Sequence, residues 1–163
     1  MIIVSDSSPL VALSIVGMLH LIERLYGELR IPEAVLEEVT VSGKPSSREL
    51  EAFLENKTQA VRNRIAADML GSAIGKGEAE AIILALETNA SAVMIDDRKA
   101  RRYARMRELP VTGTVGLLIQ AKSRGLVENI YPLIYKMERS GIRLSPRIVE
   151  IALREAGEKP PHP

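Results

Sequence analysis

Short runs of β-branched and other apolar residues alternate along the chain with longer segments in which apolar positions recur every three or four residues. The first pattern predicts buried strands, and the second predicts helices with one face in the core. We expect strands at residues 2–4, 28–31, 91–95 and 109–112. We expect helices at residues 9–15, 18–26, 32–39, 47–54, 78–87, 98–107, 114–123, 128–140 and 146–156.

Two stretches between these elements have distinctive local signals. Ser7 and Ser8, followed by Pro9, offer an N-cap and a residue suited to a first helical turn. Residues 56–74 have helical spacing without a clear helix start, and the sequence Gly75-Lys76-Gly77 that follows them predicts a hinge-like break.

Strands that alternate with helices predict an α/β fold with a mainly parallel central sheet. In such open sheets the functional crevice lies outside the carboxyl ends of the strands. The length of 163 residues suits one domain, which we place at residues 1–156, with 142–156 as a C-terminal helical extension. Residues 157–163 contain three prolines and are expected to form a flexible tail.

Composition narrows the possible partners and chemistry. Hydrophobic residues make up 46% and charged residues 26%, as in ordinary globular proteins, and the net charge of +1 indicates no polyanionic partner by itself. Aromatic residues make up 3%, too few for a base-stacking platform. Because the chain has no cysteine and two histidines, any metal would bind to oxygen ligands, which favours hard ions such as Mg²⁺ or Mn²⁺.

The apolar run at residues 9–22 raises the question of a membrane segment. It is shorter than the roughly 20 apolar residues that a transmembrane helix needs, and it continues directly into Glu23 and Arg24. It also lacks the basic region that precedes the apolar part of a signal peptide. The sequence therefore predicts a cytoplasmic protein with no membrane partner.

The acidic residues are distributed unevenly by type and position. The chain has 17 Glu and only 4 Asp, and Asp6, Asp96 and Asp97 directly follow predicted strands. If those strands are parallel neighbours, the three carboxylates meet at one edge of the sheet. Glu38 and Glu78, in the helices at 32–39 and 78–87, are placed to join them.

Carboxylates gathered without a neighbouring cation repel one another, and a divalent cation removes that repulsion. Mg²⁺ bound by protein carboxylates keeps several waters and bridges to phosphate oxygens. A bound metal also stabilises the attacking and leaving oxygens of an in-line displacement. The acidic residues therefore favour phosphodiester hydrolysis.

Each acid also has a purely structural interpretation. Asp6 with Ser8 could form a turn that caps the first helix, and Glu38 could be a solvated helix acid. Glu78 in a first helical turn is favoured by the helix dipole alone. Asp96 and Asp97 precede a helix and could be its N-cap pair.

A basic helix follows the two aspartates. Six of ten consecutive residues are basic: Arg98, Lys99, Arg101, Arg102, Arg105 and Arg107. Such a run is commonly a solvated face, but a phosphate backbone that passes an acidic site would contact the same residues. We take Arg98, Lys99 and Arg102 as candidate substrate-binding residues.

Several motifs, in order, resemble the PIN-domain family of metal-dependent ribonucleases, which includes the VapC-type toxins. Ile3-Val4-Ser5-Asp6-Ser7-Ser8 is similar to the family's first acid after a strand, and Ile31-Pro32 followed by Glu38 is similar to its second. The segment from Gly77 and Glu78 to Ala85 resembles the third, and the segment from Val93 to Arg98 resembles the fourth. Residues 142–149 resemble the C-terminal segment of one branch, described as uncharacterised nucleic-acid-binding proteins.

The resemblance implies a three-layer α/β/α sandwich, one or two Mg²⁺ or Mn²⁺ ions, and endonuclease activity on single-stranded or structured RNA. It also implies a homodimer and, for a toxin, a small antitoxin partner. Asp6, Glu38, Glu78 and Asp97 would be the catalytic metal ligands, with Asp96 as a substitute for Asp97 and Ser8 holding Asp6 or a phosphate oxygen. The sequence departs from the family pattern at Glu78, where Asp is commoner, and at Ile95, where many members have Thr. Residues 56–74 match no family segment and are either a branch-specific insertion or a dimer element.

Two other functional hypotheses are compatible with the sequence. The chain could be a non-catalytic PIN-fold module that binds nucleic acid or protein through the basic helix. It could also be an aspartyl-phosphate enzyme, but Asp6-Ser7-Ser8 lacks the second aspartate of haloacid-dehalogenase-type phosphatases.

Overall fold

The computed structural model describes residues 1–44 and 46–159. Within them, four strands and ten helices follow one another along the chain. In chain order these elements are β1 (Ile2–Ser5), α1 (Ser7–Ile15), α2 (His20–Tyr26), β2 (Glu28–Arg30), α3 (Glu33–Val39), α4 (Ser47–Phe53), α5 (Arg64–Gly71), α6 (Lys76–Glu87), β3 (Ala92–Met94), α7 (Arg98–Met106), β4 (Val111–Thr112), α8 (Thr114–Ser123), α9 (Tyr131–Arg139) and α10 (Pro146–Glu155).

The four strands form one parallel sheet in the order β2-β1-β3-β4. The chain moves from β1 to β2 on one side and later returns to place β3 on the other side of β1. The order therefore reverses between β1 and β3, and this reversal is the place where open α/β sheets bind ligands, outside the carboxyl ends of the strands. Asp6 directly follows β1 at this point, and its backbone N–H donates to Met94 O of β3 (2.9 Å).

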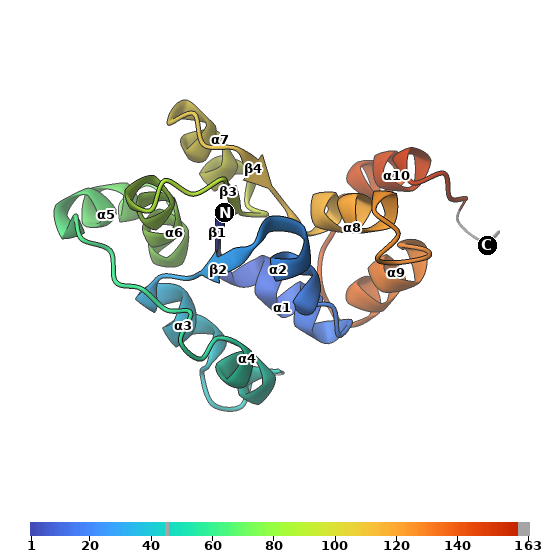
Figure 1. Ribbon diagram of the computed structural model, residues 1–163, viewed down its shortest axis with the longest axis horizontal. Coiled ribbons are helices and arrows are strands. Elements are labelled where there is room, and N and C mark those ends of the chain that lie inside the picture. Colours follow the sequence, from blue (N-terminus) through green and yellow to red (C-terminus); the bar gives the residue numbers. More distant parts are fainter. Residues whose placement is uncertain (45, 160–163) are drawn as a thin grey trace.

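Helices cover both faces of the sheet, so the molecule has three layers (Figure 1). Side chains alternate along each strand: Ile3 and Met94 pack with α1, α2 and α8 on one face, whereas Val4 and Val93 pack with α6 and α7 on the other. The α/β sandwich predicted from the sequence is confirmed.

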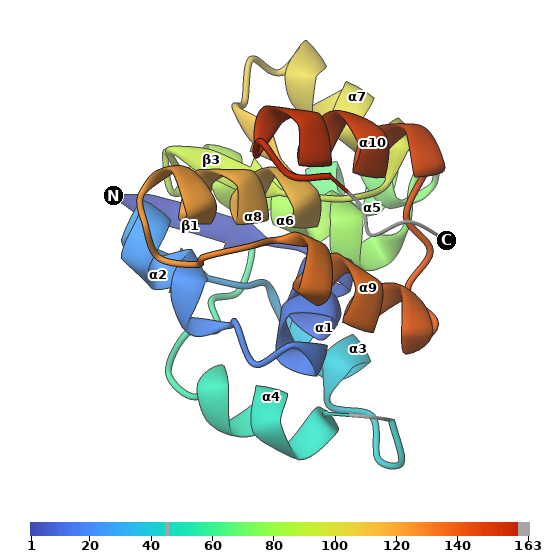
Figure 2. The same cartoon turned by 90° about the vertical axis from the view of Figure 1, so that its right-hand side faces the viewer.

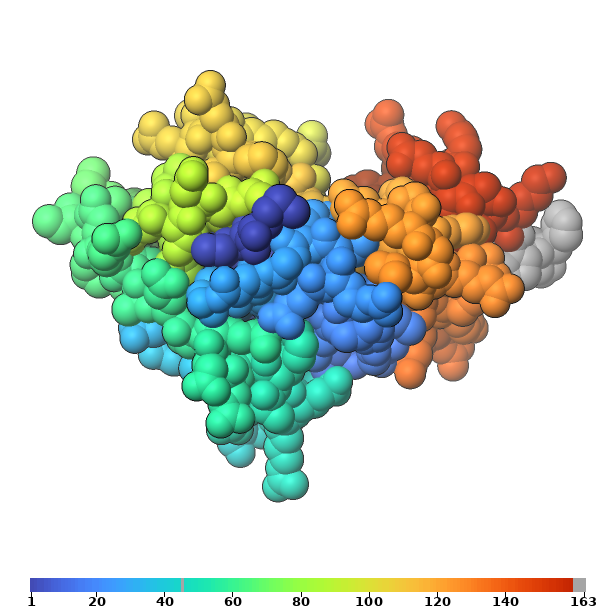
Figure 3. Space-filling model, viewed as in Figure 1, coloured from blue at the N-terminus to red at the C-terminus, as the bar shows by residue number. Residues whose placement is uncertain are grey.

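The carboxyl ends of the strands lie away from the N-terminus. Figure 2 shows β1 running from the N-terminus at the left into the molecule. In the space-filling view the N-terminal residues, coloured darkest blue, lie at the surface (Figure 3). The side chains that follow β1 and β3 therefore lie at the edge of the sheet where the strands end, opposite the edge at which the N-terminus enters β1.

The structure differs from the sequence-based expectation at the starts of several helices. Helix α1 begins at Ser7 with Asp6 as its N-cap residue, two residues before the predicted start at Pro9. Helix α6 begins at Lys76, so the predicted break at Gly75–Gly77 is the first turn of that helix. Residues 56–74 contain α5, which packs against α6.

The predicted tail is attached to the domain at its beginning. The Glu158 carboxylate is buried and accepts hydrogen bonds from the backbone N–H groups of Ile130 (2.9 Å) and Tyr131 (3.0 Å), and it forms an ion pair with Lys122. Residue 158 therefore caps the start of α9, contrary to the flexible tail predicted from residue 157. Residues 160–163 of that predicted tail lie outside the described residues.

Among the described residues, no single helix is long and apolar enough to cross a membrane. The pair α1 and α2 passes that test only when both are taken together, and they are bent by 119° at the break between them.

Candidate active site

Asp6 is the most deeply buried acid of the predicted site. Its side chain follows β1 and is 4% exposed, and it makes no capping hydrogen bond to α1. Asp6 therefore occupies the N-cap position of α1, but its side chain does not form the cap that the structural interpretation expected. The pKa of Asp6 is raised to about 7: burial is the largest cause, the backbone N–H of Ser7 acts in the opposite direction, and the charges of Glu78, Glu38 and Asp96 contribute to the increase.

Glu38 reaches the site from α3. Its Oε2 accepts a hydrogen bond from Ser7 Oγ (2.9 Å), which fixes its carboxylate beside the start of α1. The two carboxylates of Glu38 and Asp6 approach each other over Gly77: a Cβ there would lie 3.1 Å from Glu38 Oε2 and 3.3 Å from Asp6 Oδ1. The first turn of α6 thus carries no side chain at the point where the two carboxylates meet.

Glu78, one residue further along α6, is half-buried at the same place. Its Oε2 accepts from the backbone N–H of Gly75 (3.0 Å), so it also caps its own helix. Burial raises the pKa of Glu78; the Gly75 amide lowers it, and the charges of Asp97 and Glu38 raise it. Glu78 therefore caps its own helix, as the structural interpretation expected, and also lies close to the other acids.

The two aspartates after β3 have different roles. Asp97 is the N-cap of α7, where its Oδ2 accepts from the backbone N–H of Ala100 (2.9 Å). Asp96 instead turns to α8 and accepts from the backbone N–H (2.8 Å) and the Oγ1 hydroxyl (2.6 Å) of Thr114. The N-cap interpretation is therefore right for Asp97 and wrong for Asp96. The negative charge of Asp96 raises the pKa of Asp6, and that of Asp97 raises the pKa of Glu78.

A pocket of about 410 Å³ opens at this edge of the sheet. Its lining consists of Asp6, Ser8, Ala34, Glu37, Glu38, Gly75, Lys76, Gly77 and Glu78. No ion pair of the described residues involves Asp6, Glu38, Glu78, Asp96 or Asp97. Asp6, Glu38 and Glu78 therefore share a solvent-open pocket, and Lys76, which also lines it, forms no ion pair with them. Asp96 and Asp97 are not part of the lining of this pocket.

The polar residues around the acids only partly match the sequence-based expectation. Ser8 lines the pocket, but Ser7, which the sequence analysis did not select, holds Glu38. Arg98, Lys99 and Arg102 are exposed on α7, which begins beside Asp97. The half-buried Arg101 lies closer to the sheet, where its Nη1 donates to Ile95 O (3.0 Å).

The donor set fits a hard divalent cation, because carboxylate oxygens from several elements converge on one pocket and have no cationic partner there. Within residues 1–44 and 46–159, no three acidic or histidine side chains are already placed to hold one ion. Glu78 and Asp97 each accept a hydrogen bond from a helix terminus, so either would turn from that amide to join Asp6 and Glu38 at one ion.

The parallel sheet, with an acidic pocket at the reversal of its strand order, defines an α/β protein whose site is built from carboxylates. The family model DUF3368, which describes a PIN domain, matches residues 2–158. The chain therefore belongs to the PIN-domain family, whose members are generally nucleases and typically use divalent metals. Comparisons with curated proteins and with solved structures give no match.

Proposed function

We propose that this protein is a metal-dependent endoribonuclease. The observation that carries the proposal is the position of Asp6, which is almost completely buried next to carboxylates from α3, α6 and the end of β3 without an ion pair. The membership in a family of nucleases agrees with it.

A bound divalent cation would neutralise the repulsion between these carboxylates. At neutral pH, ionised acids in one pocket repel one another; the pKa values of Asp6 and Glu78 are raised first by burial and, to a smaller extent, by this repulsion. Mg²⁺ or Mn²⁺ would be held, directly or through water, by Asp6, Glu38, Glu78 and Asp97. Asp96 would add its negative charge, which raises the pKa of Asp6. A bound divalent ion supplies an activated water and charge neutralisation for phosphodiester hydrolysis.

The remaining residues position the carboxylates and the substrate. Ser7 donates to Glu38 and keeps its carboxylate turned toward Asp6. Ser8 lines the pocket and is available to a phosphate oxygen. Arg98, Lys99 and Arg102 would bind the RNA backbone beside Asp97, since a guanidinium or ammonium pairs with phosphate without reading sequence.

The proposal is tested by RNA cleavage in Mg²⁺ and in Mn²⁺. We expect cleavage by the wild-type chain, its loss on addition of EDTA, and a loss of at least about 100-fold in Asp6→Asn. The matched control is Asp68→Asn, the same substitution on the exposed face of α5, which should cleave as the wild type does. Absence of wild-type cleavage in both metals, across single-stranded and structured RNAs, would refute the enzyme proposal.

The alternative is a non-catalytic module that binds RNA through α7. The exposed basic residues of that helix favour it, because they need no metal to contact phosphates. Binding that survives Asp6→Asn but weakens in Arg102→Ala, in a chain that never cleaves, would establish this alternative. The small antitoxin, the toxin role and the homodimer stay predictions.

A further inference from the structure

Glu80 is a buried charged residue that the proposed chemistry does not use. It lies on α6 two residues after Glu78, and its side chain is 2% exposed. Burying a carboxylate is unfavourable unless it is hydrogen-bonded and paired with a cation. A residue of this type inside a helix–helix contact therefore calls for a specific role.

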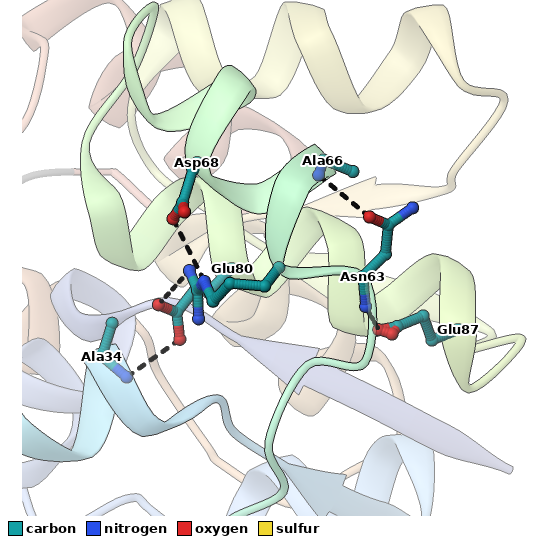
Figure 4. A network of polar contacts seen from close by, with 7 residues as sticks. Ala34, Asn63, Ala66, Asp68, Glu80 and Glu87 are labelled. Atoms are coloured by element: carbon teal, nitrogen blue, oxygen red, sulfur yellow. Dashed lines mark hydrogen bonds and ion pairs between the residues drawn. The ribbon is translucent and has the colours of Figure 1, made fainter.

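The first partner of Glu80 is the start of α3. The first N–H groups of a helix have no partner within the helix and are normally capped by a side chain. Pro32 occupies the N-cap position of α3 and provides no side-chain cap. Glu80 Oε1 accepts instead from the backbone N–H of Ala34 (3.2 Å), so the cap of α3 comes from α6 (Figure 4).

The second partner is α5. Arg64 Nη2 donates to Glu80 Oε2 (2.9 Å), and Arg64 Nε also donates to Asp68 Oδ1 one turn along α5 (3.1 Å). Helix α5 buries only Ala67 fully, and Ile65 and Met69 are 74% and 71% exposed. Besides the apolar contacts of Ala67 and the partly buried Leu70, α5 is therefore attached to α6 through the polar contact of Arg64 with Glu80.

Together these contacts join the two helices that carry acids of the pocket. Glu38 lies one turn beyond Ala34 on α3, and Glu78 lies two residues before Glu80 on α6. We infer that Glu80 is a positioning residue, whose carboxylate caps α3 from α6 with Arg64 as its counter-charge and so sets the separation of Glu38 and Glu78. This inference rests on the proposed function, because it assigns Glu80 to the geometry of the same cation site.

The structure also offers a matched control for a substitution at Glu80. Glu87, at the other end of α6, accepts hydrogen bonds from the backbone N–H groups of Arg62 (2.6 and 2.8 Å) and Asn63 (3.3 Å). It therefore attaches the same segment to α6 but has no bond to α3. Glu87→Gln should loosen this segment without moving Glu38.

The test compares Glu80→Gln with Glu87→Gln, by Mn²⁺ titration and by hydrogen exchange at the Ala34 amide. We expect both variants to unfold at lower urea than the wild type, whereas only Glu80→Gln weakens Mn²⁺ binding, by about tenfold, and accelerates exchange at Ala34. If Glu80→Gln does not fold, Arg64→Ala takes its place, since it removes the counter-charge of Glu80, together with the exposed pair to Asp68, and leaves the Glu80 carboxylate; it should change both measurements in the same direction.

The possible outcomes separate the positioning role of Glu80 from the proposed metal site itself. Mn²⁺ affinity and Ala34 exchange in Glu80→Gln within twofold of those in Glu87→Gln would overturn the positioning role while leaving the metal site intact. Faster exchange with unchanged Mn²⁺ affinity would reduce Glu80 to a structural cap and also overturn the inference. A wild-type chain that binds no Mn²⁺ would instead refute the proposed metal site, and with it any role of Glu80 in setting that site.

Discussion

Asp6→Asn should stabilise the metal-free protein at high pH, although it removes the central acid of the site. The pKa of Asp6 rises from 3.8 to about 7 on folding, and each pKa unit is worth about 1.4 kcal/mol. The folded protein therefore binds this proton more tightly than the unfolded chain by about 4 kcal/mol. This contribution to the free energy of unfolding is fully present below about pH 4 and is lost as the pH rises through about 7.

Asparagine has nearly the shape of the protonated acid and cannot ionise. In EDTA, we expect the free energy of unfolding of Asp6→Asn to exceed that of the wild type by about 4 kcal/mol at pH 8 and to match it within about 1 kcal/mol at pH 4. For a chain of this length the difference at pH 8 corresponds to a rise in Tm on the order of 10 °C. Urea unfolding followed by circular dichroism at the two pH values measures it.

The control and the effect of metal complete this experiment. Asp68 is 68% exposed, so Asp68→Asn should change stability by less than about 0.5 kcal/mol at either pH. Mg²⁺ at about 100 times the wild-type Kd should return about 2.7 kcal/mol to the wild type at pH 8, and at most about 1.4 kcal/mol to Asp6→Asn, because its affinity should be at least about tenfold lower. Parallel pH profiles of the wild type and Asp6→Asn would refute the burial and charge repulsion assigned to this carboxyl.

Two further substitutions test separate parts of the structure. Gly77→Ala places a Cβ 3.1 Å from Glu38 Oε2, so the affinity for Mn²⁺ should fall several-fold. The free energy of unfolding in EDTA should stay equal or rise by up to about 1 kcal/mol, because alanine favours a helix more than glycine does. The control is Gly71→Ala, whose Cβ meets nothing closer than 3.9 Å and which should leave the affinity unchanged. Burial raises the pKa of Glu158, but the amides that it caps and Lys122 outweigh burial and leave this pKa below its ordinary value. Glu158→Gln should therefore cost about 1–3 kcal/mol of unfolding free energy at pH 7, and this difference from the wild type should shrink as the pH falls below about 4.5, when the unfolded carboxyl takes up its proton.

The fold was predictable because its signals are local. The β-branched runs before Asp6 and Asp96 are short enough to be strands, and the helical stripe beginning at Ala79 can only be a helix. Parallel strands bring their carboxyl ends to one edge, so the chain position of the aspartates was sufficient to place them together. Glu78 was expected there because it lies in the first turn of its helix, and Glu38 because of its place near the apolar stripe of its own helix and the resemblance to the family's second acid.

The parts that were missed depend on contacts between distant residues. The pair of Arg64 with Glu80 helps to attach α5, whereas Ile65 and Met69, two of the apolar residues that gave the segment its helical spacing, point to solvent. Ser7 could not be preferred to Ser8, because its partner Glu38 is 31 residues away. Nothing near Glu158 in the sequence indicates that it caps α9.

Mn²⁺ titration of the metal-free protein, with unbound Mn²⁺ measured by electron paramagnetic resonance, tests most directly whether the carboxylates form one cation site. We expect the wild type and Asp68→Asn to bind one or two ions with equal affinity, and both Asp6→Asn and Glu38→Gln to lose at least about tenfold, although these two acids come from different elements of the fold. Equal Mn²⁺ binding by all four proteins, or none by the wild type, would contradict the account.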